Sequence, residues 1–196
     1  MSFWTSDYAA TGVNNPKRSF RFKVQFSNNT SFSGAADLAT TDVYWAKTAT
    51  KPGFTVGSVE HSYLSHTFKF PGRITWSDVT ITMVDPGGAQ GVGYVLASML
   101  NKAGYVLPAS NVYNTISKET AVASIGGSNS VVITQMDAAG NAVEQWTLYN
   151  AFIADTSFGS LDYGNEDLTE YSITIKYDWA QLTTDGGEVD FTTAAS

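Results

Sequence analysis

The chain has 196 residues, with 11 lysines and arginines against 18 aspartates and glutamates, so its formal net charge at pH 7 is −7. Hydrophobic residues make up 43% of the sequence and charged residues 15%, which excludes a disordered chain and predicts one folded domain. The absence of cysteine excludes disulfides, thiolate metal sites and cysteine nucleophiles. No apolar run reaches the roughly 18 residues of a membrane span, and the polar start lacks the pattern of a cleaved signal peptide. We therefore expect a soluble protein with no membrane anchor.

The charge is unevenly distributed along the chain. Residues 1–100 hold eight basic and six acidic residues and carry +2, whereas residues 101–196 hold three basic and twelve acidic residues and carry −9. Such an acidic second half repels phosphate, which argues against tight nucleic-acid binding. The same repulsion would let DNA pass close to the protein without adhering.

Strand patterns dominate the sequence. Apolar residues alternate over 20–26, which predicts a half-buried strand with Phe20, Phe22, Val24 and Phe26 on one face. Other runs share a high content of β-branched and aromatic residues and cover 43–48, 59–70, 131–136 and 142–153. Residues 137–141 are typical of a hairpin loop.

Two further segments also have strand patterns. Between residues 74 and 83 the apolar alternation slips by one residue near Ser77 and Asp78, which predicts a β-bulge. Residues 171–179 alternate without interruption, so one face is apolar and the other polar. The polar face consists of Glu170, Ser172, Thr174, Lys176 and Asp178.

Helical patterns are few. Apolar residues at i, i+3, i+4, i+7 and i+8 from Val92 to Leu100 predict one amphipathic helix that ends at Gly104. A weaker pattern predicts a second helix that begins near Ser117 and ends at the glycine pair 126–127.

The segments that invite a chemical interpretation lack the required geometry. His61 and His66 are five residues apart in a strand pattern, which predicts opposite faces and excludes a shared metal. The glycine-rich segment 85–93 lacks the spacing of a phosphate loop and is interpreted as a tight turn before a helix. The acidic segment 162–170 lacks the alternating ligands of a calcium loop and is interpreted as a solvated turn, with a cation site as the alternative. The sequence thus predicts no catalytic residue, no metal site and no cofactor.

A series of short motifs occurs in a recognisable order. They read FKVQF (22–26), AKTATKPGF (46–54), HSYL (61–64), FKFPGR (68–73), WSDVTITMVD (76–85), NAF (150–152), FG (158–159), LDY (161–163) and YSITIKYDW (171–179). Together they resemble the inner tail tube proteins of T-even-like contractile phages over about residues 20–182. The segment of about 108–130 and both tails differ from that family's pattern.

The resemblance implies a fold and a domain organisation. We expect a mainly β, single-domain β-sandwich, partly rolled and barrel-like, with one flanking α-helix. Long edge strands would form a continuous inner β-barrel in a hexameric ring. Residues 1–196 would form one tail-tube domain with a core of about 18–182 and mobile extensions at both ends.

The resemblance also implies a structural role and no enzymatic activity. The protein would form stacked hexameric rings in the virion tail, assembled in the host bacterial cytoplasm, as the conduit for DNA delivery. Its partners would be itself, the tail sheath, tape measure, baseplate tube-initiator and tail terminator proteins, and transiting DNA that is not tightly bound. The alternatives are a tube protein of a phage-like contractile injection system, a baseplate tube-initiator and, more remotely, a carbohydrate-binding β-sandwich module, since 13% of residues are aromatic.

Three sets of residues are candidates for assembly contacts. A loop with a Pro-Gly turn beside an aromatic and two bases suits a contact to the next ring, and its candidates are Lys51, Pro52, Gly53 and Phe54. Long strands with unpaired edges suit ring closure, and the candidate strand-edge residues are Ile74, Trp76, Val79, Ile81, Tyr171, Ile173, Ile175 and Tyr177. The polar face of 170–178 is a candidate lining of an acidic lumen.

Overall fold

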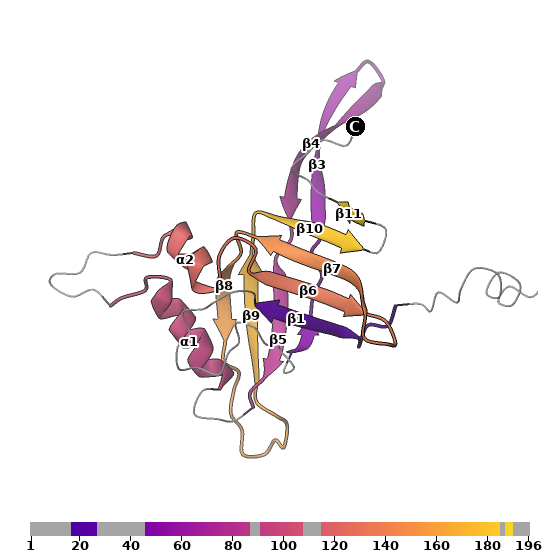
Figure 1. Cartoon of the computed structure of the whole chain (residues 1–196). Coiled ribbons are helices and arrows are strands. Elements are labelled where there is room, and N and C mark those ends of the chain that lie inside the picture. Colours follow the sequence, from indigo (N-terminus) through magenta and orange to yellow (C-terminus); the bar gives the residue numbers. More distant parts are fainter. Residues whose placement is uncertain (1–16, 27–45, 87–90, 108–114, 185–186, 190–196) are drawn as a thin grey trace, which may run out of the picture.

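The computed structural model describes residues 17–26, 46–86, 91–107, 115–184 and 187–189, and the strands and helices within these ranges are labelled in Figure 1. Their bounds are β1 Phe22–Phe26, β2 Ala46–Ala49, β3 Phe54–Tyr63, β4 His66–Trp76, β5 Val79–Val84, α1 Val92–Lys102, α2 Lys118–Ser124, β6 Val131–Met136, β7 Ala142–Tyr149, β8 Phe152–Ser157, β9 Glu170–Lys176, β10 Trp179–Thr184 and β11 Gly187–Val189.

Two antiparallel sheets form a sandwich, which confirms the predicted mainly β fold. The five-stranded sheet has the order β1-β6-β7-β10-β11 and the four-stranded sheet the order β2-β5-β9-β8. The core lies between them because alternate apolar residues of both sheets point inward. Fully buried core residues include Val24, Ile81, Leu148, Ile173 and Ile175. None of the described helices has the length and apolar character to span a membrane.

Two short helices lie beside β8, where the resemblance implied one (Figure 1). In α1 the predicted apolar stripe is buried from Val92 to Met99, whereas Leu100 is half-exposed. The second helix, α2, begins at the predicted position, because Ser117 and Thr120 form a capping box that binds backbone N–H groups at its start. Gly126 follows the helix with a φ of 117°, a conformation that favours glycine.

The predicted β-bulge at Ser77 and Asp78 is wrong. These two residues separate β4 from β5, which belong to different sheets. The slip in the apolar alternation therefore marks the point where the chain leaves one sheet and enters another. Register shifts near this segment lie in the β3–β4 pair, between Val56 and Ser58, and in the β2–β5 pair, between Ala46 and Thr48.

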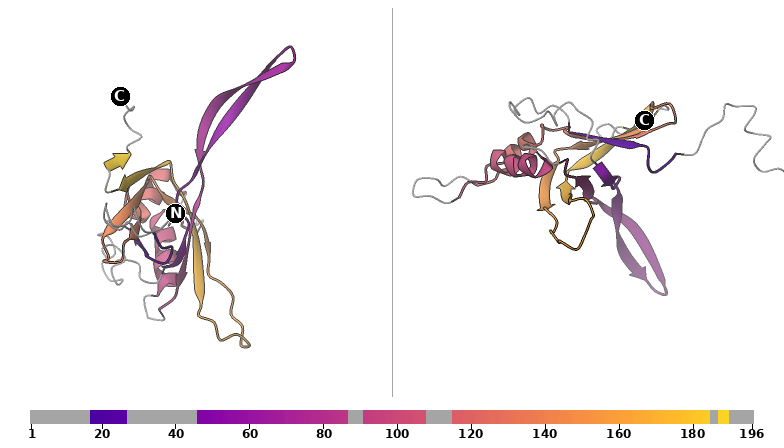
Figure 2. Two further views of the ribbon diagram at one scale, coloured as in Figure 1. Left: turned by 90° about the vertical axis from the view of Figure 1, so that its right-hand side faces the viewer. Right: turned by 90° about the horizontal axis from the view of Figure 1, so that it is seen from below.

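The predicted run 59–70 is a hairpin rather than a single strand. β3 and β4 pair antiparallel as a sheet of their own that projects beyond the sandwich, as Figure 2 shows from two further sides. The chain reverses between Tyr63 and His66, which pair with each other. His61 and His66 therefore lie on the same face. The prediction of opposite faces is wrong, because it holds only for a strand that continues between the two residues.

Candidate assembly surfaces

The β3–β4 hairpin, residues 54–76, is called the arm below. Its root is held by aromatic and backbone contacts to the four-stranded sheet. The ring of Trp76 lies edge-on to Phe54, at 5.5 Å between centroids, and 5.9 Å from Tyr177. The Tyr177 hydroxyl donates to the Ser77 carbonyl at 2.8 Å, and burial raises the pKa of Tyr177 to about 12. These contacts fix the direction in which the arm leaves the sandwich.

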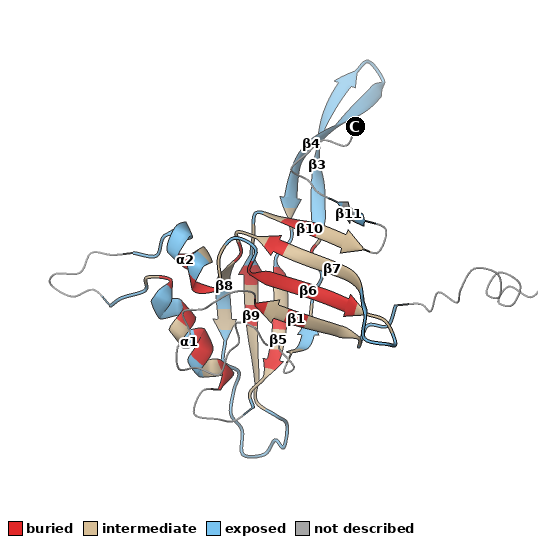
Figure 3. Ribbon diagram, viewed as in Figure 1, coloured by how far each residue is buried: buried red, intermediate tan, exposed pale blue. Residues whose placement is uncertain are grey.

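The arm itself is exposed along its whole length, apart from the half-buried Trp76 at its root (Figure 3). Beyond the bulge its two faces differ, because cross-strand partners share a face. One face is apolar and aromatic and also carries both histidines: Val59, His61, Tyr63, His66, Phe68 and Phe70. The other face is polar, with an ion pair between Lys69 and Glu60 at 3.3 Å and a hydrogen bond between Ser62 and Thr67 at 3.3 Å.

An exposed arm of this kind is typical of a surface that contacts another protein. An isolated two-stranded hairpin is at best marginally stable in water, and monomeric proteins rarely expose a long apolar patch. At the tip Leu64 is 91% exposed and Tyr63 65% exposed. The sequence did not predict the turn because Leu64 has a φ of 54°, a conformation that turn patterns assign to Gly or Asn.

The predicted contact loop is not the part that protrudes. Lys51 is anchored to the five-stranded sheet, since its ammonium donates to Gln135 Oε1 at 2.6 Å and to Glu144 Oε1 at 2.7 Å. Pro52 is buried and Gly53 half-buried. Only Phe54, the first residue of β3, is exposed as expected. The protrusion begins where the candidate loop ends.

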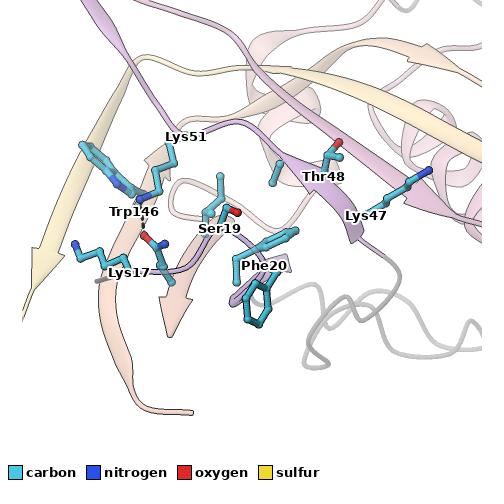
Figure 4. Close-up of a pocket in the computed structure, with 11 residues that line it drawn as sticks. Lys17, Ser19, Phe20, Lys47, Thr48, Lys51 and Trp146 are labelled. Atoms are coloured by element: carbon cyan, nitrogen blue, oxygen red, sulfur yellow. Dashed lines mark hydrogen bonds between the residues drawn. The ribbon is translucent and has the colours of Figure 1, made fainter. Parts of the chain in front are cut away.

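Lys51 lines a groove of about 620 Å³ where β1 and β2 meet, drawn in Figure 4. Its lining combines the lysines Lys17, Lys47 and Lys51 with the aromatic rings Phe20, Phe22 and Trp146. Beneath it, Glu144 accepts from Lys17, Lys51 and the Trp146 indole N–H. Partial burial opposes ionisation of Glu144, but these hydrogen bonds outweigh it and lower its pKa to about 2. Glu144 thus joins two segments to β7, a role that no local sequence pattern indicates.

The predicted strand-edge residues are placed differently by the structure. β5 and β9 are the two central strands of their sheet, and Val79, Ile81, Ile173 and Ile175 are fully buried. Because both sides of a central strand are already paired, these residues stabilise the protomer core and offer no edge. Ile74 is exposed on the arm, and Trp76, Tyr171 and Tyr177 pack partly buried against the core. Within the described chain the outer strands of this sheet are β2 and β8.

The predicted polar face is present on β9, but it is not acidic. Ser172 and Thr174 alternate with buried Ile173 and Ile175 and pair with Thr82 and Thr80 of β5, so the face is rich in hydroxyl groups.

Each charged residue on the polar face of β9 has a partner of opposite charge within the protomer. Glu170 accepts from Lys47, and Lys176 lies 3.9 Å from Asp78. Asp178 lies beyond β9, where its carboxylate is bound by Lys118 of α2 at 2.7 Å and by the Asn150 amide at 2.9 Å.

The acidic segment 162–170, predicted as a solvated turn, lies in the β8–β9 loop, residues 158–169, except for Glu170, which begins β9. Asp162 Oδ1 accepts from the Gly164 N–H at 2.9 Å, and Asn165 Oδ1 accepts from the Asp167 N–H at 3.0 Å. The loop surrounds a hollow of about 920 Å³. Its exposed apolar residues are Phe158, Leu161, Tyr163 and Leu168.

No family model and no curated protein sequence matches the chain. Solved structures match it over most of its length. A chain in the cryo-EM structure of the anti-feeding prophage cap, the AFP tube terminating cap, is 17% identical with a TM-score of 0.60, and the match covers 94% of this chain and 99% of that one. A chain in the sheath-tube complex of the extracellular contractile injection system PVC is 17% identical with a TM-score of 0.59, covering 92% and 97%.

A chain in the six-fold symmetrised baseplate of the anti-feeding prophage is similar as well, at 14% identity and a TM-score of 0.60, covering 87% of this chain and 97% of that one. At such identities the likeness establishes the fold. The chain therefore has the β-sandwich fold of these chains from contractile injection assemblies.

Proposed function

We propose that the protein is a structural subunit of the tube in a contractile injection apparatus and has no catalytic role. The observation that carries this proposal is the fold shared over nearly full length with chains from a tube cap, a sheath-tube complex and a baseplate. The partners would be further copies of this chain, a sheath and a baseplate. The inner tail tube of a contractile phage is the second candidate, favoured by the ordered motifs of the sequence; there the partners would include tape measure, tube-initiator and terminator proteins.

Ring formation would use the outer strands of the four-stranded sheet. β2 and β8 lie at its two sides, and pairing β8 of one copy with β2 of the next would join unlike edges. Such head-to-tail contacts close into a ring when the rotation between copies fits, and six copies would extend the sheet into a continuous barrel. β2 and β8 thus take the place of the central strands β5 and β9 as the proposed contacts between neighbouring copies.

Stacking would use the arm, which replaces the Lys51–Gly53 segment as the contact between rings. Joining Ser58 to Pro71 through Asn-Gly removes the exposed residues 59–70 and leaves the paired root. We expect purified wild-type protein to form tubes and the shortened variant to stop at single rings in negative-stain microscopy. Ser62→Ala/Thr67→Ala, which keeps the length and the apolar face, should form normal tubes. If the shortened variant formed long tubes, the arm could not be the contact that stacks the rings.

The lumen would be lined by the hydroxyl-rich outer face of β5 and β9. Because its charges are matched, it offers transiting DNA neither strong attraction nor strong repulsion. Wild-type tubes are expected to show no salt-sensitive DNA affinity, since binding through phosphate contacts must weaken steeply as salt rises. A sedimentation assay with duplex DNA at low and high salt measures this, and a basic DNA-binding protein serves as the positive control. If DNA bound at low salt and not at high salt, the lumen lining would attract DNA and this proposal would be wrong.

A further inference from the structure

The arm and the β8–β9 loop leave the four-stranded sheet at opposite ends. β4 leads into the start of β5, where Val79 pairs with Ile175, whereas the loop precedes Glu170, which pairs with Val84 at the end of β5. Figure 1 and the left view of Figure 2 show the arm at the top and the loop at the bottom of the sandwich. In copies stacked along this direction, the arm of one would face the loop of the next.

The two segments carry opposite charge. The arm has two basic residues and one acidic residue, a formal charge of +1, and also two histidines. The loop 158–169 has three acidic residues and no basic one, a formal charge of −3. The charged residues are Lys69, Arg73 and Glu60 on the arm and Asp162, Glu166 and Asp167 on the loop.

Apolar surface is exposed on both segments as well. In the loop Leu161 is 88% exposed and Leu168 71% exposed, and both line the 920 Å³ hollow. The arm offers its aromatic face and the apolar tip at Tyr63 and Leu64. Burying these residues against each other would remove apolar area from water on both sides, while the charged groups fix the orientation.

We propose that the arm of one copy docks in the hollow of the β8–β9 loop of a second copy, an inference that rests on the proposed tube function and names the receptor for its arm. The groove where β1 and β2 meet is a poorer receptor, because its lysines have the same sign as the arm. Since donor and receptor lie at opposite ends of each copy, the contact is head to tail and does not close, so it propagates as a column.

A charge exchange tests the contact. Lys69→Glu/Arg73→Glu changes the arm from +1 to −3, and Glu166→Lys/Asp167→Lys changes the loop from −3 to +1. These loop positions leave the Asp162 side chain in its turn. Each double variant alone should raise the protein concentration needed for tubes at least about ten-fold, because like charges then face each other. The quadruple variant restores opposite signs and should polymerise near the wild-type concentration.

The outcomes separate this inference from the proposed function. Loss in both double variants with recovery in the quadruple variant supports the contact. Wild-type tubes that neither double variant weakens would overturn the arm–loop contact and leave the tube function standing. Wild-type protein that forms no ring or tube would overturn both.

Cysteine cross-linking gives a second measurement that does not depend on how the charge variants fold. The chain has no cysteine, so Leu64→Cys at the arm tip and Leu161→Cys in the loop introduce single thiols. Under mild oxidation an equimolar mixture of the two variants should yield covalent dimers well beyond either variant alone. A mixture of Leu64→Cys with Glu119→Cys, on exposed α2 surface, is the control. Equal yields in both mixtures would overturn the proposed receptor.

Discussion

Replacing Ile175 with proline is expected to unfold the protomer rather than merely to block assembly. Ile175 is fully buried on a central strand and pairs with Val79 on one side and Ile153 on the other. Proline cannot donate to the ladder and removes the buried side chain. Together these losses cost about 4 kcal/mol or more, a large part of the roughly 5–15 kcal/mol of a typical domain. Circular dichroism during urea unfolding measures the loss.

Ile175→Val is the matched control, because it keeps the backbone N–H and removes one methylene. It should lower the free energy of unfolding by about 1 kcal/mol and still allow tubes to form. If Ile175→Pro unfolded with the wild-type midpoint, β9 could not be a central strand of this sheet.

Glu144→Gln is expected to lower the free energy of unfolding by about 2 kcal/mol at pH 7. The wild-type carboxylate is only 11% exposed and is bound by two lysines and one indole N–H, so the charged form is the one that the fold stabilises. Glutamine keeps the size but loses the charge. The measurement is urea unfolding at a series of pH values.

The pH dependence has a definite sign. Since folding lowers the pKa of Glu144 from 4.5 to about 2, its contribution is fully present above pH 4.5 and is lost as the pH falls toward 2. A difference of that size corresponds to about 3 kcal/mol as an upper limit. The lysine side chains are 44% and 45% exposed, so solvent screening reduces it. Glu144→Gln should flatten the stability profile of the protein between these pH values.

Glu60→Gln provides the control for an exposed ion pair. The side chains of Glu60 and Lys69 are 56% and 71% exposed, so the variant should lose less than about 1 kcal/mol. If Glu60→Gln lowered the free energy of unfolding as much as Glu144→Gln, solvent exposure would not explain a difference in strength between the two ion pairs.

The sequence alone was sufficient to predict the strands and helices in which apolar residues repeat with a single period. β1, β9, α1 and the β6–β7 hairpin were predicted because side-chain alternation and helical spacing are local properties. The start of α2 was predicted for the same reason, since its cap at Ser117 lies within one turn of the residues that it binds. The β-sandwich followed from these strands and from the resemblance to tail tube proteins.

The sequence failed where the outcome depended on distant partners. The turn at Leu64 has no glycine or asparagine, so the local pattern predicts one continuous strand and opposite faces for the two histidines. Lys51 was predicted in a protruding loop because its acceptor Glu144 is 93 residues away. Strand order could not be deduced either, since β5 and β9 have the same alternation as an edge strand would have.

By itself, the sequence determined that this is a folded, cysteine-free, mainly β protein with an acidic second half, because composition and periodicity are properties of the chain. Only the tertiary structure decided where the charge and the apolar surface lie. It pairs Glu170 and Lys176 on the polar face of β9 with residues of opposite charge. It leaves the β8–β9 loop with three acidic residues and no basic one. It places the exposed arm at the opposite end of the sheet. The physical reason is that antiparallel pairing brings residues about a hundred positions apart side by side, and no local pattern encodes which strands will pair.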